Sequence, residues 1–432
     1  MQNNVNTSMI NKKILSLWQW MTRVGFLHLL SANILIQIAG FGGQLFLTRI
    51  ITVEDIAVIR VLQSYYSILI IAATFGINMS IIKICSEDID ELKKRQIFSL
   101  GFYSSIIINI IVLSIFIYVI NLGFFTTDKK VLKYLFVYNL QIPFFVLTSI
   151  IFSYYHSQKQ VKLVSNFQSL TKISAIVVSV LLAIKLGLEG YIYGLVVCNA
   201  LAFFILFFYV KKDLVFITRE IIKKIEIRAI FSTGIYSFGT NILWQLLLYL
   251  NIIMASYMVN NKEAIAFYGM AHLIVNTMMM IPMTLNQIMI PYISRESKDY
   301  NKVSTLLKSY QKKMVLLIFP VCIISYFILP LLLPYLLGEE YEGASVYFKI
   351  LLFMLFFWSL FSPKMNTLLA VGRIIYNFYT YMFSIVIYII LNITLMPIYG
   401  MLGAAIAISL TFFFTLFVNH FYFLKYKREV EF

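Results

Sequence analysis

Long apolar runs separated by short polar segments fill almost the whole chain. A helix rises roughly 1.5 Å per residue, so about 20 apolar residues cross a hydrocarbon core of about 30 Å. Twelve runs reach this length, near residues 24–50, 57–84, 97–121, 131–155, 163–185, 188–210, 230–258, 264–293, 314–337, 345–370, 375–397 and 401–424. The pattern therefore predicts an all-α polytopic membrane protein with twelve transmembrane helices.

Two of these runs carry the same polar pattern, small-x-Asn-Ile-Leu-x-Gln, at residues 31–37 and 239–245. Asn33 and Gln37 share one helical face, as do Asn241 and Gln245, because residues four apart are neighbours on a helix. An unpaired amide in lipid costs on the order of several kcal/mol. The amides therefore either hydrogen-bond to neighbouring helices or face a shared cavity, and their recurrence in both halves favours the cavity.

The recurrence extends along the chain. Residues 54–57 match 263–266, and residues 187–190 match 400–403, at spacings of 209 and 213. We therefore predict two six-helix halves, 1–210 and 230–424, joined by a basic cytoplasmic linker helix at 211–229 and followed by a tail at 425–432. Because six is even, the halves share one orientation. Parallel repeats of this kind place a substrate path in a central cavity between them.

Composition and charge narrow the class. The chain is 61% hydrophobic and 12% charged, with a mean hydropathy of +0.86, which excludes a water-soluble protein. Of its 35 basic residues, 24 fall on the side that holds both termini and seven on the other. This bias predicts that both termini are cytoplasmic. The net charge of +16 then indicates contact with anionic membrane lipids and not with nucleic acid.

Several motifs together resemble a known family. Residues 395–409 contain Pro397, Gly400 and Gly403 in the pattern Pro-x-x-Gly-x-x-Gly-Ala-Ala, and residues 337–344 contain Gly-x-x-Tyr-x-x-Ala. Residues 47–54 and 75–80 complete the set. In this order and spacing they resemble the polysaccharide-export flippases of the O-antigen (Wzx) type, in the multidrug/oligosaccharidyl-lipid/polysaccharide exporter superfamily. The resemblance covers essentially the whole chain.

The resemblance implies a function as well as a fold. Members of this family move undecaprenyl-diphosphate-linked oligosaccharide units, O-antigen or a related surface polysaccharide, from the inner to the outer leaflet by alternating access. It implies a location in the bacterial inner membrane, an ion gradient of protons or sodium as the energy source, and no cofactor. A polysaccharide polymerase and a chain-length regulator are the expected protein partners, and the chain itself is not expected to be an enzyme.

Charge inside the membrane supports an anionic substrate. None of the 19 acidic residues lies deep within a predicted span, whereas exporters of organic cations usually need a buried carboxylate. Basic side chains suit a diphosphate. The candidates for the substrate pathway are Lys172, Lys364, Arg60, Arg49 and Lys83.

These basic candidates differ in depth. Lys172 is the strongest, because it lies roughly 14 Å along its span, too deep for easy snorkelling. For Lys364, the pathway and a structural role are equally favoured. Arg60 and Arg49 lie toward the outer ends of their spans, where snorkelling to the interface is the preferred interpretation. Lys83 lies near the inner interface, where it either anchors the helix or meets the lipid diphosphate first.

The eighth span carries the candidates for gating or coupling. His272 and Asn276 are one turn apart, and Pro282 follows. A proline inside a helix breaks the hydrogen-bond ladder and bends the helix. His272 could couple transport to protons, although a histidine bonded between helices is the more frequent case. Neither a nucleotide-binding loop nor a metal-ligand spacing is present.

Three other functions were weighed. A multidrug cation antiporter of the same superfamily is disfavoured by the missing buried carboxylates. A membrane-embedded polysaccharide polymerase needs sizeable outer loops, and the outer loops here are short. A lipid II flippase is disfavoured because family examples usually have two further helices.

Overall fold

The computed structural model describes residues 26–87, 89–123, 126, 128–214, 224–297 and 299–431, and the side chains of 26–34, 224–234, 236–237 and 431 are not described. The first half contains α2 (Phe26–Leu47), α3 (Val53–Thr74), α4 (Ile77–Cys85), α5 (Glu91–Asn121), α6 (Lys129–Asn139), α7 (Gln141–Ser157) and α8 (Val161–Val210). The second contains α9 (Lys224–Met258), α10 (Lys262–Met278), α11 (Met280–Arg295), α12 (Tyr300–Leu337), α13 (Ala344–Ala370), α14 (Ile374–Tyr399) and α15 (Met401–Glu431).

The predicted fold class is confirmed: the described elements are helices, and ten helical segments are long and apolar enough to cross a membrane. The fifth and sixth predicted spans both lie within α8, an element of 50 residues in which Gly187 has non-helical φ and ψ and separates two helices by a kink. α2 corresponds to the first span, and its described apolar part is shorter, Leu35–Leu47. The count of twelve therefore stays a prediction.

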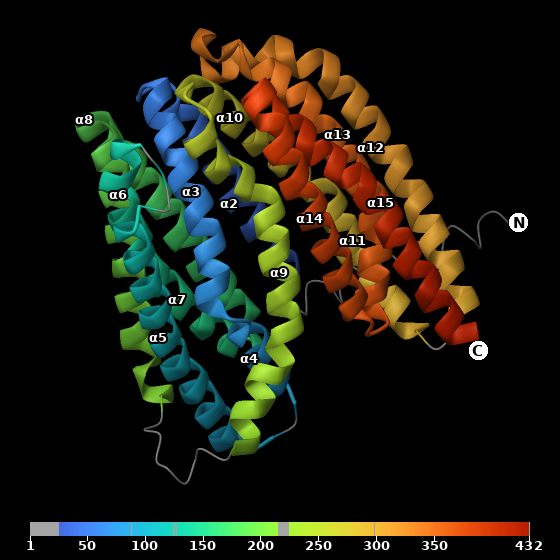
Figure 1. Ribbon diagram of the computed structural model, residues 1–432. Helices are drawn as coiled ribbons and strands as arrows, with labels where there is room; N and C mark the ends of the chain where they lie inside the picture. The colour runs from blue at the N-terminus through green and yellow to red at the C-terminus, as the bar shows by residue number, and fades with distance from the viewer. Residues whose placement is uncertain are drawn as a thin grey trace, which may run out of the picture.

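The two halves lie side by side, with α9 between them (Figure 1). α3 of the first half packs along α9 and α10 of the second, and these contacts form most of the junction. Following the orientation predicted from charge, we call the end that holds the starts of α3, α6, α10 and α13 the outer end. It is uppermost in Figure 1.

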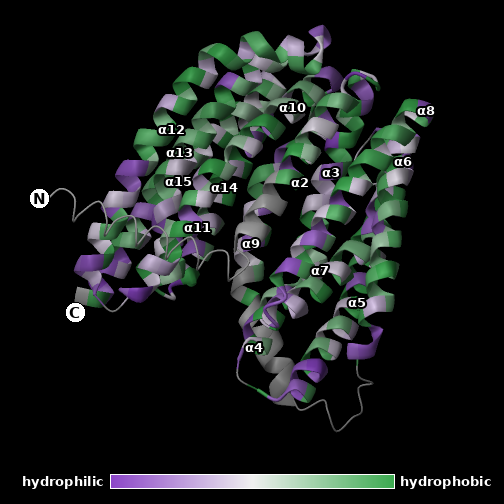
Figure 2. Cartoon of the chain, turned by 180° about the vertical axis from the view of Figure 1, so that it is seen from behind, coloured by the Kyte–Doolittle hydropathy of each residue, from purple (hydrophilic) through white to green (hydrophobic). Residues whose placement is uncertain are grey.

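Lipid exposure explains why so many apolar side chains face outward. Ile110 of α5, Leu181 of α8 and Leu331 of α12 are each more than half exposed. Figure 2 shows hydrophobic residues along most of α12 and hydrophilic residues nearer the helix ends. In water such a surface would aggregate, whereas in a bilayer it is the face that contacts lipid.

A glycine junction recurs in both halves. Gly187 inside α8 and Gly400 after α14 have nearly the same conformation, with φ and ψ of 59° and −139°, and of 58° and −137°. Residues other than glycine rarely adopt this backbone conformation. Three residues later, a Cβ at Gly190 or at Gly403 would overlap the carbonyl oxygen of Leu182 or Leu395, respectively. The same turn thus occurs twice, 213 residues apart, which supports the predicted repeat at this position.

The predicted linker is described only in part. Lys211–Asp213 form a short 3-10 helix, residues 215–223 lie outside the described residues, and α9 begins at Lys224. The helix of the seventh span therefore begins inside the range predicted as linker. The other predicted domain boundaries stay predictions.

Candidate substrate cavity between the two halves

The guanidinium of Arg60 lies buried at the junction of the halves. Arg60 is seven residues after the start of α3, about 10 Å along the helix, and it is 5% exposed. Its Nη1 donates to Oε1 of Gln63 at 2.8 Å, and its Nη2 donates to Oε1 of Gln44 at 2.9 Å. The expectation that Arg60 snorkels to the interface is wrong, because α10 of the second half covers this side of α3.

Gly269 of α10 makes room for that side chain. A Cβ at Gly269 would overlap the Cγ of Arg60 at well under contact distance. Gly269 follows Arg60 by 209 residues, the spacing that relates this part of the two halves. The repeat thus places a cation on one half and a glycine at the matching position of the other, and the cation occupies the space that the glycine leaves.

A second layer of polar groups holds the arginine in place. The hydroxyl of Tyr191 accepts a hydrogen bond from Nε2 of Gln44 at 2.9 Å and a longer one from Nε2 of Gln63 at 3.5 Å. Tyr191 is 4% exposed and comes directly after the Gly187–Gly190 turn of α8. The glycine turn therefore positions a hydroxyl that orients both amides bonded to Arg60.

The charge of Arg60 is incompletely satisfied. Its Nε is buried and has no hydrogen-bonding partner, and no carboxylate lies within ion-pair distance among the described residues. A buried donor without a partner costs about 1–3 kcal/mol, and more when it is charged. The arrangement is therefore costly unless an anion binds there.

Arg60 opens onto a cavity of about 250 Å³ that both halves line. The lining is polar and aromatic, and none of its described residues is acidic. Besides Arg60 it includes Gln63, Tyr66, Tyr138, Tyr249, His272 and Asn276. This composition suits a ligand that combines negative charge with hydroxyl groups, because guanidinium binds phosphate oxygens and amides bind hydroxyls.

His272 and Asn276, the candidates for coupling or gating in the eighth span, both line this cavity, and their part in coupling stays a prediction. His272 is 2% exposed, and its ring stacks on Tyr268 and meets the edge of Tyr249. Nδ2 of Asn276 lies 3.2 Å from Nδ1 of His272. Oδ1 of Asn276 is buried and has no partner. The pair therefore offers an open acceptor to a ligand.

The helix that carries these two residues is interrupted just beyond them. α10 ends at Met278 and α11 begins at Met280. Met278 is the residue whose carbonyl would bond to the N–H that Pro282 lacks. The break that Pro282 predicts is present, and its role in gating stays a prediction.

The structure places Lys172 beside this cavity and not in its lining. Its Nζ lies 5.8 Å from the ring centroid of Phe145, on α7. The Phe145 ring in turn meets the edge of Tyr66, which lines the cavity. Two rings thus separate Lys172 from the cavity. Its part in the pathway stays a prediction, but Arg60 takes the central position that the sequence favoured for Lys172.

The remaining basic candidates lie elsewhere. Arg49 is exposed at the outer end, and its Nη2 donates to the carbonyl oxygen of Tyr335 on α12. Lys83 is exposed near the end of α4. Nζ of Lys364 lies 2.9 Å from Nδ1 of His420, between α13 and α15. The structure does not bring these three together with Arg60.

Gln37, Asn241 and Gln245, the described amides of the two strips, do not line the cavity around Arg60. Gln37 of α2 is exposed, and the side chain of Asn33 lies outside the described residues. Asn241 is exposed on α9, and Gln245 is half-buried with an unpartnered Oε1. Whether the strips face one another across a larger opening stays a prediction.

Sequence reasoning missed Gln44, Gln63 and Tyr191, which complete the site. Two glutamines inside apolar spans were a usable signal, because buried amides need partners. The tyrosines could not be selected, since 29 occur in the chain and most of them pack in the core or at the interface.

Comparison with known proteins identifies a family and a shared fold. The family model described as "Polysaccharide biosynthesis protein" matches residues 46–346, well over half of the chain. No curated protein matches the chain by sequence. The structure is similar to the lipid II flippase MurJ in an inward closed conformation, with a TM-score of 0.74 and 17% identity, covering 91% of this chain and 86% of that one.

Two further solved structures share the fold. An inward-facing multidrug resistance MATE family transporter of the MOP superfamily has a TM-score of 0.75 and 11% identity, covering 94% of this chain and 98% of that one. A MOP superfamily transporter from Pyrococcus furiosus, described as having a binding pocket of reverse polarity, has a TM-score of 0.62 and 12% identity, covering 94% and 95%.

The chain has the multi-pass helical fold of these structural neighbours, which are transporters and flippases and not enzymes, and ten of its described helical segments are long and apolar enough to cross a membrane. The chain belongs to the polysaccharide biosynthesis protein family.

Proposed function

We propose that the protein moves a lipid-linked oligosaccharide, attached through a diphosphate to undecaprenol, from the inner to the outer leaflet by alternating access. The observation that carries this proposal is the Arg60 guanidinium, buried between the halves with an open Nε donor and without a carboxylate. A diphosphate supplies the negative charge that this position lacks.

The other cavity groups suit the sugar portion. Tyrosine rings offer faces for stacking, and Asn276 offers an unpartnered oxygen to a hydroxyl. The lipid tail has no polar group to satisfy and can stay in the bilayer beside the transporter. The membership in a polysaccharide biosynthesis family supports a glycan cargo.

The cavity as it stands is too small for such a cargo. About 250 Å³ is below the roughly 300–1,000 Å³ typical of a small-molecule site. The halves are held together at the outer end, where Thr48 donates to the carbonyl of Leu337 at 2.8 Å and Lys262 pairs with Asp128 at 2.7 Å. Transport therefore requires the halves to separate and admit the head group.

The alternative functions fit the site less well. A multidrug cation antiporter would place a cation beside Arg60, where like charges repel. A polysaccharide polymerase is disfavoured by structural neighbours that are transporters and flippases. O-antigen as the product, a proton or sodium gradient as the energy source, a bacterial inner membrane with cytoplasmic termini, and a polymerase and chain-length regulator as partners belong to this proposal.

The test is the binding of undecaprenyl diphosphate to the purified full chain. Arg60→Ala removes the cavity's cation, and we expect the dissociation constant to rise by about 10–100-fold, the value of one or two charge-assisted hydrogen bonds. Arg373→Ala is the matched control, because Arg373 is exposed at the inner end and pairs with Glu429. Equal affinity of Arg60→Ala and the unmodified chain would contradict the proposal.

A further inference from the structure

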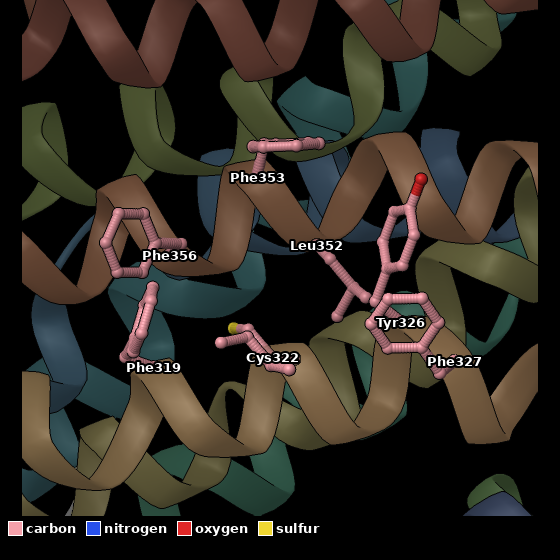
Figure 3. Close-up of a pocket in the computed structure, with 8 residues that line it drawn as sticks. Phe319, Cys322, Tyr326, Phe327, Leu352, Phe353 and Phe356 are labelled. Atoms are coloured by element: carbon pink, nitrogen blue, oxygen red, sulfur yellow. The ribbon is translucent and has the colours of Figure 1, made fainter.

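A groove on the lipid-facing side of the second half runs between α12 and α13. It encloses about 220 Å³, and Figure 3 shows side chains of the two helices meeting across it. Its lining is apolar or aromatic: Phe319, Cys322, Tyr326 and Phe327 from α12, and Phe353 and Phe356 from α13.

The aromatic surface continues from this groove onto α15. Phe319 contacts Phe356 with ring centroids 5.9 Å apart, and Phe356 contacts Phe357 at 5.8 Å. Phe357 then meets Phe413 of α15 at 5.3 Å, and Phe413 meets Phe417 at 5.1 Å. α12 and α15 both pack extensively on α13 but barely on each other. α13 thus forms the floor of an aromatic trough with α12 and α15 on either side.

Polar groups close this trough at its inner end. Lys364 follows Phe357 by two helical turns, and His420 follows Phe417 by one, so both lie inward of the rings. Nζ of Lys364 donates to Nδ1 of His420 at 2.9 Å. Among the described residues, no carboxylate lies within ion-pair distance of Lys364. The trough therefore combines an apolar body with a cationic head.

A second basic group lies at the same end. A shallow hollow of about 460 Å³ is lined by Gln311, Lys312 and Phe319 among others, and Phe319 also lines the first groove. Nε2 of Gln311 donates to the carbonyl of Leu360 at 3.4 Å, one turn before Lys364. The hollow and the groove thus meet at Phe319, and Lys312 of α12 and Lys364 of α13 both lie inward of it.

We propose that this trough binds one anionic phospholipid of the inner leaflet, with its phosphate at Lys364 and Lys312 and an acyl chain in the groove. The depth is suitable: Lys364 is six residues before the end of α13, about 9 Å from that end. A lysine at this depth reaches the level of lipid phosphates. The ammonium groups of Lys364 and Lys312 supply positive charge for the phosphodiester, and His420 holds that of Lys364 in place.

The transported lipid is a less suitable occupant. α13 packs on α10, α10 lines the Arg60 cavity, and none of the residues that line the groove between α12 and α13 also lines that cavity. The trough therefore lies behind the second half, away from the junction through which a cargo head group must enter. A lipid in the trough would instead hold α12 and α15 against α13.

Native mass spectrometry of the purified full chain tests this site, with phosphatidylglycerol and phosphatidylcholine as the added lipids. We expect phosphatidylglycerol to be retained preferentially, and Lys364→Gln to lower its bound fraction at least fivefold. Lys211→Gln is the matched control, because Lys211 is an exposed lysine at the inner end of the first half, over the ring of Phe208, and lies outside the trough. It should retain the lipid as the unmodified chain does.

A second variant tests the groove without altering charge. Cys322→Trp fills the space between α12 and α13, and it should lower the retention of phosphatidylglycerol even if Lys364→Gln purifies poorly. Equal retention of both lipids, or unchanged retention in both variants, would overturn the proposal. Displacement of phosphatidylglycerol by an equimolar amount of undecaprenyl phosphate would also overturn it, because the trough would then bind the cargo lipid.

Discussion

At the scale of single residues, the site depends on one residue from each half. Arg60 supplies the charge and Gly269 supplies the space, at positions that the internal repeat relates. Gln44, Gln63 and Tyr191 then fix the guanidinium by hydrogen bonds. A cation held in this way is ready to bind an anion without losing much side-chain entropy on binding.

Gly269→Ala should therefore impair the site without unfolding the chain. The added methyl group displaces the stem of Arg60, so we expect the affinity for undecaprenyl diphosphate to fall by about tenfold. Alanine favours a helix by about 1 kcal/mol over glycine, so helix α10 itself should not weaken. The measurement is ligand binding together with thermal unfolding in detergent.

Gly42→Ala is the control for this experiment. Gly42 also lies within a helix, but a Cβ there would meet no atom within 4 Å. It should leave binding unchanged. If Gly269→Ala binds as tightly as the unmodified chain, the close fit of Arg60 against α10 is not needed for the site.

The sequence predicted a cationic pathway, and Arg60 was among its candidates. Whether these residues take part in transport stays a prediction. Arg60 was ranked below Lys172 because the sequence shows only how far along a span each residue lies. Burial of Arg60 depends on which helix covers it, and that follows from the packing of α10 against α3, which lies 209 residues away in the sequence.

At the scale of helices, the outer end is closed by caps that also join the halves. Asp128 caps α6 by accepting from the N–H of Lys130 at 2.8 Å, and it pairs with Lys262 at the start of α10 at 2.7 Å. Thr52 and Asn261 cap α3 and α10 in the same way, 209 residues apart. The start of α10, which the repeat predicts, is thus also a point where the halves meet.

Asp128→Asn should loosen the outer end. Burial raises the pKa of Asp128. The hydrogen bond and the charge of Lys262 have a larger, opposite effect, so the pKa of Asp128 is below its ordinary value. A lowered pKa means that the ion pair is fully present at neutral pH and is lost only as the pH falls through that lowered value. The substitution removes the charge at neutral pH, at a cost of about 1 kcal/mol or less for a partly exposed pair.

The measurement is the distance between spin labels on α6 and α10 at the outer end, with and without this substitution. We expect a broader and longer distribution in Asp128→Asn. Glu189→Gln is the control, because Glu189 pairs with Lys133 at the same end but within one half. An unchanged distribution in Asp128→Asn, or an equal change in both variants, would show that the Asp128–Lys262 pair does not hold the halves.

At the scale of the whole molecule, hydropathy and charge predicted the fold class, and repeated glycine and cap positions agree with two related halves. The two predicted spans of α8 end and begin at residues 185 and 188, and the structure has its kink between them, at Gly187. The sequence could not show that the halves are closed at the outer end, since that depends on contacts between distant segments.

The most direct test of the central claim is translocation in proteoliposomes that contain the purified chain and an undecaprenyl-diphosphate-linked oligosaccharide with a fluorescent sugar. The sugar's accessibility to a membrane-impermeant quencher reports the leaflet that it occupies. We predict rapid exchange between leaflets with the unmodified chain and at least a tenfold slower rate with Arg60→Gln. Exchange at the same rate in both, or at the rate of protein-free liposomes in both, would contradict the account.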